Sequence, residues 1–133
     1  MCSYDPATTL PDFAATLVQE EDGTPIVSVF GEVDLHTVHD LDILMLKATS
    51  EAGESGFVIV DLGGVEFMDL TGLRVLINAQ SILENSGGSL AVVCGGQAGR
   101  LFEVTGLADD FEIYDDLGSA VAAYPVGGYA LGA

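Results

Sequence analysis

Short apolar runs alternate along this chain with longer segments in which apolar residues recur at helical spacing. The runs at 14–19 and 26–30 flank an acidic turn at 20–25, and this order predicts an antiparallel hairpin. Further apolar runs of strand length lie at 57–60, 90–94 and 111–114. We therefore expect a sheet of four to five strands that begins with an N-terminal strand pair.

Helical spacing is clearest from residue 37 to about 52, where apolar residues recur every three or four positions and Gly53 lies just beyond the end. Similar patterns predict helices at 71–85, 97–105 and 117–124. Strands that alternate with about four helices indicate an α/β layered fold with a mostly parallel sheet.

The most informative segment is 57–79, because a buried strand, a loop and an amphipathic helix follow one another there. Asp61-Leu62-Gly63-Gly64 has turn chemistry and is expected to end the strand. Asp69 is of the type that caps a helix, and the apolar positions after it give that helix one buried face. The loop before the helix is therefore expected to be held rigidly.

The length of 133 residues and an apolar content of 49% fit a single domain. We expect a flexible leader at 1–13, the domain at 14–124 and a Gly-rich tail at 125–133. The tail either is disordered or lies over a neighbouring surface. No run approaches the roughly 20 apolar residues of a membrane span, and the N-terminus lacks a signal-peptide pattern, so we expect a cytoplasmic protein without membrane insertion.

Charge narrows the choice of partners. The chain has 21 acidic residues against three basic ones, for a net charge of −18. Such a field disfavours nucleic acid and favours encounter with a basic protein surface. A second explanation, that the charge only keeps the protein soluble or suits a salty cytoplasm, is equally compatible with the composition.

Four short motifs follow one another along the chain: Gly31-Glu32-Val33-Asp34, Asp69-Leu70-Thr71-Gly72-Leu73, Gly87-Gly88-Ser89-Leu90 and the segment 100–107. In this order they resemble the STAS domain of anti-sigma-factor antagonists. Each is weak alone, but four in the fitting order are specific. The resemblance spans about 14–124 and implies a small bacterial regulator that binds a kinase-like anti-sigma factor and frees a sigma factor. It implies no catalysis and no cofactor.

The resemblance also places the binding face at the loop before the second helix. The partner-binding residues that it implies are Asp34, Met68, Asp69, Leu70, Thr71, Leu73 and Arg74. Leu70 and Leu73 are expected at an apolar centre with part of Met68, and Arg74 at the rim. Asp34 has the alternative role of capping the first helix, whereas Asp69 can cap and contact a partner at once.

In the family, the residue directly after the loop aspartate is typically a serine that the partner kinase phosphorylates. Here that residue is Leu70, which has no hydroxyl, so the standard switch cannot operate there. Leu70 is either a core residue or an exposed apolar contact. Thr71 is the candidate phosphosite, and its alternative role is only a hydrogen bond at the helix start.

Other residue patterns carry little chemistry. His36 and His39 are expected to be solvated helix residues rather than metal ligands, because a zinc site needs three or four convergent ligands. Cys2 and Cys94 are expected to be a free terminal thiol and a small core residue rather than a redox pair. We expect a binding module and not an enzyme. The alternative is a structural STAS subunit of a signalling scaffold or a lipid-transport ATPase, and homodimer formation stays open.

Overall fold

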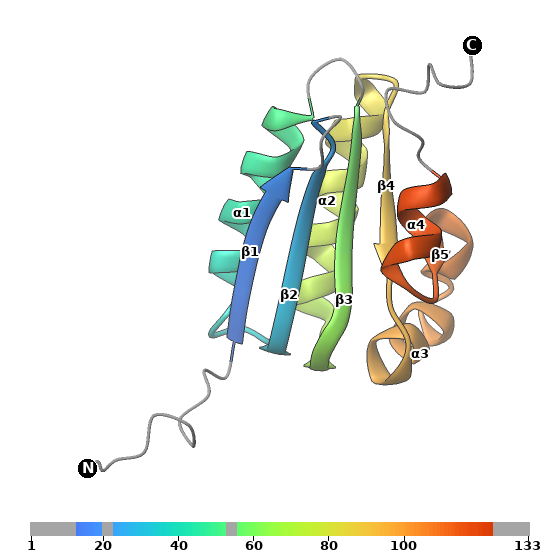
Figure 1. Ribbon diagram of the computed structural model, residues 1–133. Coiled ribbons are helices and arrows are strands. Elements are labelled where there is room, and N and C mark those ends of the chain that lie inside the picture. Colours follow the sequence, from blue (N-terminus) through green and yellow to red (C-terminus); the bar gives the residue numbers. More distant parts are fainter. Residues whose placement is uncertain (1–12, 20–22, 53–55, 124–133) are drawn as a thin grey trace.

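The computed structural model describes residues 13–19, 23–52 and 56–123. Its elements, in chain order, are β1 (Phe13–Gln19), β2 (Pro25–Val33), α1 (Val38–Glu51), β3 (Phe57–Met68), α2 (Leu70–Asn85), β4 (Ser89–Val93), α3 (Gly96–Val104), a 3₁₀ turn (Leu107–Asp110), β5 (Glu112–Tyr114) and α4 (Leu117–Ala123). Figure 1 shows this arrangement. The predicted leader and tail lie outside the described residues, except for Phe13, with which β1 begins.

The strands form one five-stranded sheet in the order β1-β2-β3-β4-β5. β1 runs antiparallel to β2, and every other neighbouring pair is parallel. The predicted α/β fold with an N-terminal strand pair is confirmed. Parallel neighbours arise here because a helix connects each strand to the next one along the sheet.

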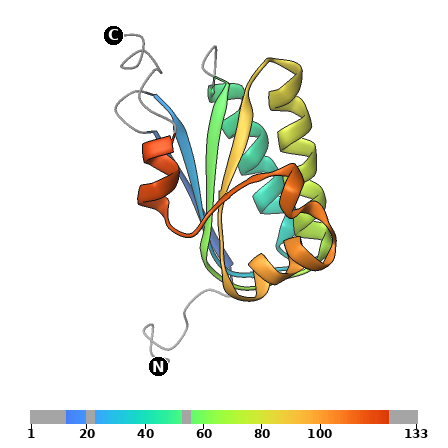
Figure 2. The same ribbon diagram turned by 90° about the vertical axis from the view of Figure 1, so that its right-hand side faces the viewer.

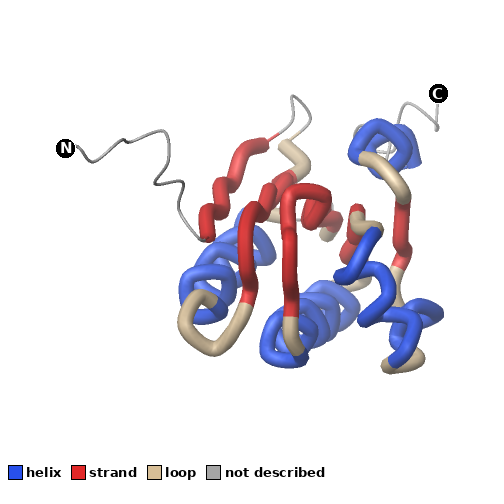
Figure 3. Tube along the Cα trace, turned by 90° about the horizontal axis from the view of Figure 1, so that it is seen from below, coloured by secondary structure: helices blue, strands red, loops and turns tan. Residues whose placement is uncertain are grey.

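Helices cover the two faces of the sheet unequally. Figure 2 shows α4 on one side of the sheet and the other helices on the opposite side, and Figure 3 shows the same layers from below. The larger core cluster lies between the sheet and α1, α2 and α3. A smaller cluster under α4 contains Ile26, Ile59, Ala91, Val93 and Ala120. None of the helices in the described part of the chain is long and apolar enough to cross a membrane.

The prediction that a turn ends the third strand at residues 61–64 is wrong, because β3 continues to Met68. Gly64 is needed for close packing instead. A Cβ atom there would lie 2.2 Å from Cδ1 of Phe30, so the Phe30 ring occupies the space. The register between β2 and β3 also shifts between Ser28 and Phe30, which marks a bulge.

Candidate functional site

Two loops lie side by side at the carboxyl ends of β2 and β3. The strands pair Glu32 with Phe67 and Val33 with Met68. Just beyond this pair, the Asp69 N–H donates a hydrogen bond to the Val33 carbonyl over 3.1 Å. The segment that leads into α1 is therefore fixed against the segment that leads into α2.

Asp69 caps α2, as predicted. Its Oδ1 accepts a hydrogen bond from the Thr71 N–H over 2.9 Å, and the Thr71 hydroxyl also donates to the same carboxylate. The helix-start hydrogen bond expected of Thr71 is thus present. An acidic cap also interacts favourably with the positive end of the helix dipole.

Gly72 brings the first turn of α2 close to the ends of both strands. A Cβ atom on Gly72 would lie 2.7 Å from Met68 Cγ and 2.9 Å from Val33 Cγ1, and both side chains are fully buried. Contacts this short do not occur between real side chains, so only glycine fits without movement. The loop is therefore held by packing as well as by its cap.

Gln97 of α3 holds the last residue of β3, a role that the sequence analysis missed. The Met68 N–H donates to Gln97 Oε1 over 2.8 Å, and Gln97 Nε2 donates to the Met68 carbonyl over 3.0 Å. β4 ends at Val93, opposite Asp61, and so does not reach this level of β3. A single side chain therefore supplies the two hydrogen bonds that a longer strand would give.

Asp34 does not cap α1, because the helix begins at Val38 and its N-cap residue is Thr37. Asp34 organises the preceding turn instead. Its Oδ1 accepts from the His36 N–H over 2.9 Å, and its own N–H donates to Thr37 Oγ1 over 3.0 Å. The Thr37 hydroxyl in turn donates to the Glu32 carbonyl over 2.8 Å. Local hydrogen bonds thus fix this loop too.

Three large apolar side chains are exposed in this region, one in the turn after β2, one at the end of β3 and one at the start of α2. Leu35 is 73% exposed, Leu70 is 57% exposed and Phe67 is 43% exposed. Of the two alternatives for Leu70, the exposed one is therefore correct. Leu35 and Phe67 were missed. Leu35 directly follows the Gly31–Asp34 motif, and that position was the one available signal.

Met68 and Leu73 do not belong to this surface. They are 0% and 1% exposed and lie in the larger core cluster, so a direct contact with a partner does not fit their positions. Both support the loop from beneath. Asp34, Asp69 and Thr71 are half-buried and Arg74 is exposed. We call the exposed and half-buried residues of this region the loop surface: Asp34, Leu35, Phe67, Asp69, Leu70, Thr71 and Arg74.

Redox and metal chemistry find little support in the described residues. Cys94 is buried and free, and burial, with smaller contributions from Asp115 and Glu103, raises the pKa of its thiol to about 11. The thiol is therefore uncharged at neutral pH and poorly reactive. Cys2 lies outside the described residues. His36 and His39 are exposed, and the described part of the chain has no group of three or more potential ligands that could hold a metal ion.

Comparisons with known proteins agree with this fold. The STAS domain family matches residues 15–120. Over 84 residues the chain is 33% identical to an anti-sigma-B factor antagonist of Staphylococcus epidermidis, covering 62% of this chain and 76% of that protein. The structure of the present chain is similar to that of an anti-sigma factor antagonist from Mycobacterium paratuberculosis, with a TM-score of 0.77 and 28% identity over 86% of this chain and 97% of the other. A likeness of fold extends to phosphorylated SpoIIAA of Bacillus, with a TM-score of 0.66 and 20% identity over 84% and 100% of the two chains.

Proposed function

Since this chain belongs to the STAS domain family, we propose that it acts as an anti-sigma-factor antagonist. It binds an anti-sigma factor of kinase-like fold and so releases a sigma factor, which regulates transcription in the cytoplasm of a bacterium. It acts by binding alone and neither makes nor breaks a covalent bond. Relatives that are named anti-sigma-B factor antagonists support this proposal.

The observation that carries the proposal is the exposure of Leu70 at the rigidly held start of α2. Leu70 lies directly after the Asp69 cap and is more than half exposed, although exposure of a leucine side chain to water is unfavourable. Leu35 in the neighbouring turn and Phe67 at the neighbouring strand end are further exposed apolar side chains. A rigid apolar centre of this kind suits a protein interface of roughly 800 Å² per partner.

Acidic groups surround this apolar centre. Asp34 and Asp69 lie within the loop surface, and Glu32 and Glu66 are exposed next to it. Arg74 supplies one positive charge at the rim. A partner that fits this arrangement presents an apolar patch with a mainly basic border, and the net charge of −18 speeds its encounter with the chain.

Leu70 also makes this binding insensitive to phosphorylation at the position where the family typically carries serine. Thr71 is the nearest hydroxyl, and its O–H group already donates a hydrogen bond to the Asp69 carboxylate. A phosphate on Thr71 would place about −1.5 to −2 charges beside Asp69, would weaken the cap and would strongly change the affinity of the loop surface for its partner. Thr71 is therefore the site at which phosphorylation would still switch binding.

The test is capture of partners by the tagged full-length chain from a lysate of its own cells with added ADP, followed by mass spectrometry of partners and bait. We expect a kinase-fold anti-sigma factor with the wild type and its loss with Leu70→Lys or Asp69→Lys. Val104→Lys is the matched control, because Val104 is an exposed apolar residue on α3. Equal capture by Leu70→Lys and Val104→Lys would remove the loop surface from the proposal. Phosphate on Thr71 of the bait would identify the remaining switch.

A second candidate function is a structural STAS subunit of a signalling scaffold or a lipid-transport ATPase. The observation that favours it is the same Leu70, because a structural subunit has no need of a phosphorylated serine. The same capture experiment separates the two functions. Recovery of transporter subunits or of large STAS assemblies, with an unmodified bait, would support the second one.

A further inference from the structure

The outer edge of β1 has an unusual composition for this chain. β1 is at one end of the sheet and pairs only with β2 among the described strands, as the left margin of the sheet in Figure 1 shows. Its seven residues contain no charge and no proline, and they pair with β2 without a register shift. Proteins usually protect a regular edge strand with charges, proline or a bulge, because its free backbone groups can pair with another strand. The described part of β1 has none of these.

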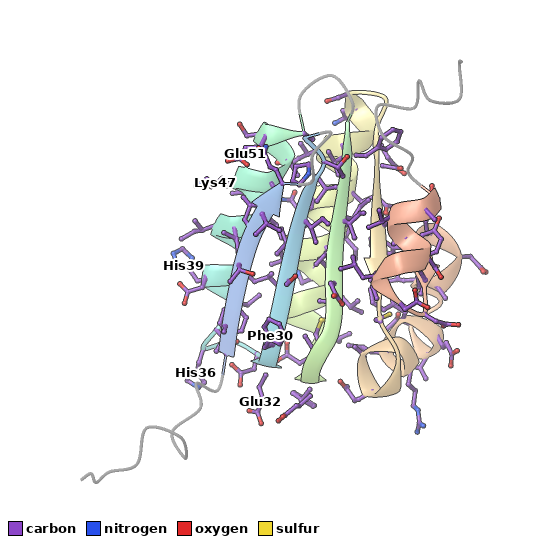
Figure 4. The ribbon with its side chains drawn as sticks, viewed as in Figure 1. Phe30, Glu32, His36, His39, Lys47 and Glu51 are labelled. Carbon is purple, nitrogen blue, oxygen red and sulfur yellow. The ribbon has the colours of Figure 1, made fainter. Side chains whose placement is uncertain are left out.

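A stripe of side chains on α1 lies beside this edge. Asp40, Leu44, Lys47 and Glu51 follow one another at steps of three or four residues, so these four lie on one side of α1, and His36 lies in the turn just before the helix, four residues before Asp40. This side faces β1, because Gln19 Nε2 donates a hydrogen bond to Glu51 Oε1 over 3.3 Å. In Figure 4, His36, Lys47 and Glu51 lie along the β1 side of the molecule.

The polar side chains of this stripe are complementary to those of a second copy that runs antiparallel to the first. In an antiparallel arrangement of two copies, Lys47 of one copy meets Asp40 of the other, and Glu51 meets His36, with Leu44 close to the centre. A twofold axis repeats each of these pairs. The chain has only three lysine and arginine residues, and one of them, Lys47, lies in this stripe.

From these features we propose that the chain forms a twofold symmetric homodimer in which two β1 strands pair antiparallel and join the two sheets. The positions of residues along β1 and along α1 are compatible with the same twofold axis. Leu44 lies about 10 Å before Glu51 along the helix, and Thr16 lies about 10 Å before Gln19 along the strand. An axis through Thr16, the middle residue of β1, therefore also passes Leu44.

The distance between the two α1 helices is suitable as well. α1 covers β1 and β2. The helix axis therefore lies one strand spacing, about 5 Å, from the twofold axis at the outer edge of β1. Two such helices on either side of the axis are about 10 Å apart, which is the distance at which helices pack. The dimer places the two loop surfaces at opposite ends of the joined sheet.

Sedimentation equilibrium of the full chain tests this dimer between about 1 μM and 1 mM protein, at about 0.15 M and 1 M salt, since screening reduces the repulsion of two highly charged copies. We expect a monomer–dimer equilibrium that tightens with salt. Thr16→Lys should raise the Kd of the dimer by about tenfold or more, because it places two ammonium groups at the axis. Thr16 is exposed, so the fold should persist, and circular dichroism checks this. Ser81→Lys on the exposed face of α2 is the control and should leave the Kd unchanged.

A charge exchange tests the register of the interface. Lys47→Asp and Asp40→Lys alone should each raise the Kd by about threefold to tenfold, and the double variant should return it to within about threefold of the wild type. A chain that stays monomeric at both salt concentrations overturns the proposal. A dimer whose Kd responds equally to Thr16→Lys and Ser81→Lys also overturns it, and so does a double variant that dimerises more weakly than both single variants. In these cases the dimer would form through another surface, and the β1 edge would be left for a strand of another protein.

Discussion

Two neighbouring connections from a parallel strand into a helix, β3 to α2 and β4 to α3, are built differently. Before α2, the Asp69 carboxylate caps the helix and Gly72 packs tightly against Met68 and Val33. Before α3, the N-cap is Gly95, which has no side chain to donate or accept, and a Cβ atom added there would meet nothing within 4 Å. The topology is the same at both places, but only the first helix has a side-chain cap and a tightly packed glycine at its start.

The difference shows what makes a loop suitable for binding. Parallel strands bring several loops to one edge, but a loop holds an exposed leucine in a fixed position only when caps and packing restrain its backbone. The second connection even supports the first, because Gln97 of α3 makes two hydrogen bonds to Met68. We therefore regard the β4–α3 connection as a support for the loop surface and not as a second binding surface.

The largest effect is expected when one glycine in each helix is replaced by alanine. Gly72→Ala forces Met68 and Val33 to move and should lower the free energy of unfolding by about 1–3 kcal/mol. Gly99→Ala in α3 meets only ordinary contacts at 3.9 Å and 4.0 Å. It should raise the free energy of unfolding by up to about 1 kcal/mol, because alanine favours a helix. Urea denaturation of both variants measures the difference, and equal stabilities would show that the loop before α2 is not tightly packed.

Gln97→Ala tests whether α3 supports the loop surface. It removes two hydrogen bonds from the Met68 backbone and should cost about 1–2 kcal/mol of stability. It should also weaken capture of the partner, although Gln97 is not part of the loop surface. Gln97→Glu is the informative companion, because a carboxylate still accepts from the Met68 N–H but cannot donate to its carbonyl. Unchanged stability in both variants would contradict the supporting role of Gln97.

Features set by local chemistry were predictable from the sequence. The Asp69 cap follows from an aspartate placed just before an amphipathic segment, and the sheet with its antiparallel first pair follows from the alternation of strands and helices. The exposure of Leu70 was one of two alternatives. Local patterns could not decide between them, because the burial of a residue in the first turn depends on which neighbours cover it.

Features that depend on distant contacts were not predictable. Gly63-Gly64 reads as a turn, yet the pair lies inside β3, where the Phe30 ring of β2 occupies the space above Gly64. Leu73 appeared suited to a partner but is fully buried. The bond between Gln97 and Met68 joins residues far apart in sequence, and no local pattern marks it. In each case a neighbouring element, and not the segment itself, decides the outcome.

The smallest expected effects come from removing the side-chain cap of α2 in one variant and adding a side-chain cap to α3 in another. Asp69→Ala removes the carboxylate that accepts from the Thr71 N–H and hydroxyl, and should cost about 1 kcal/mol of stability. Gly95→Ser gives α3 a capping hydroxyl, and should add a few tenths of a kcal/mol, since the Gly95 backbone is extended and space is free around it. Urea denaturation measures both changes, with Ser119→Ala as a control substitution on α4 away from both caps.

Asp69→Ala should also lose partner binding, whereas Gly95→Ser should keep it. A Gly95→Ser variant that is less stable than the wild type would mean that the β4–α3 connection is already as restrained as the loop before α2, and the contrast between them would fail.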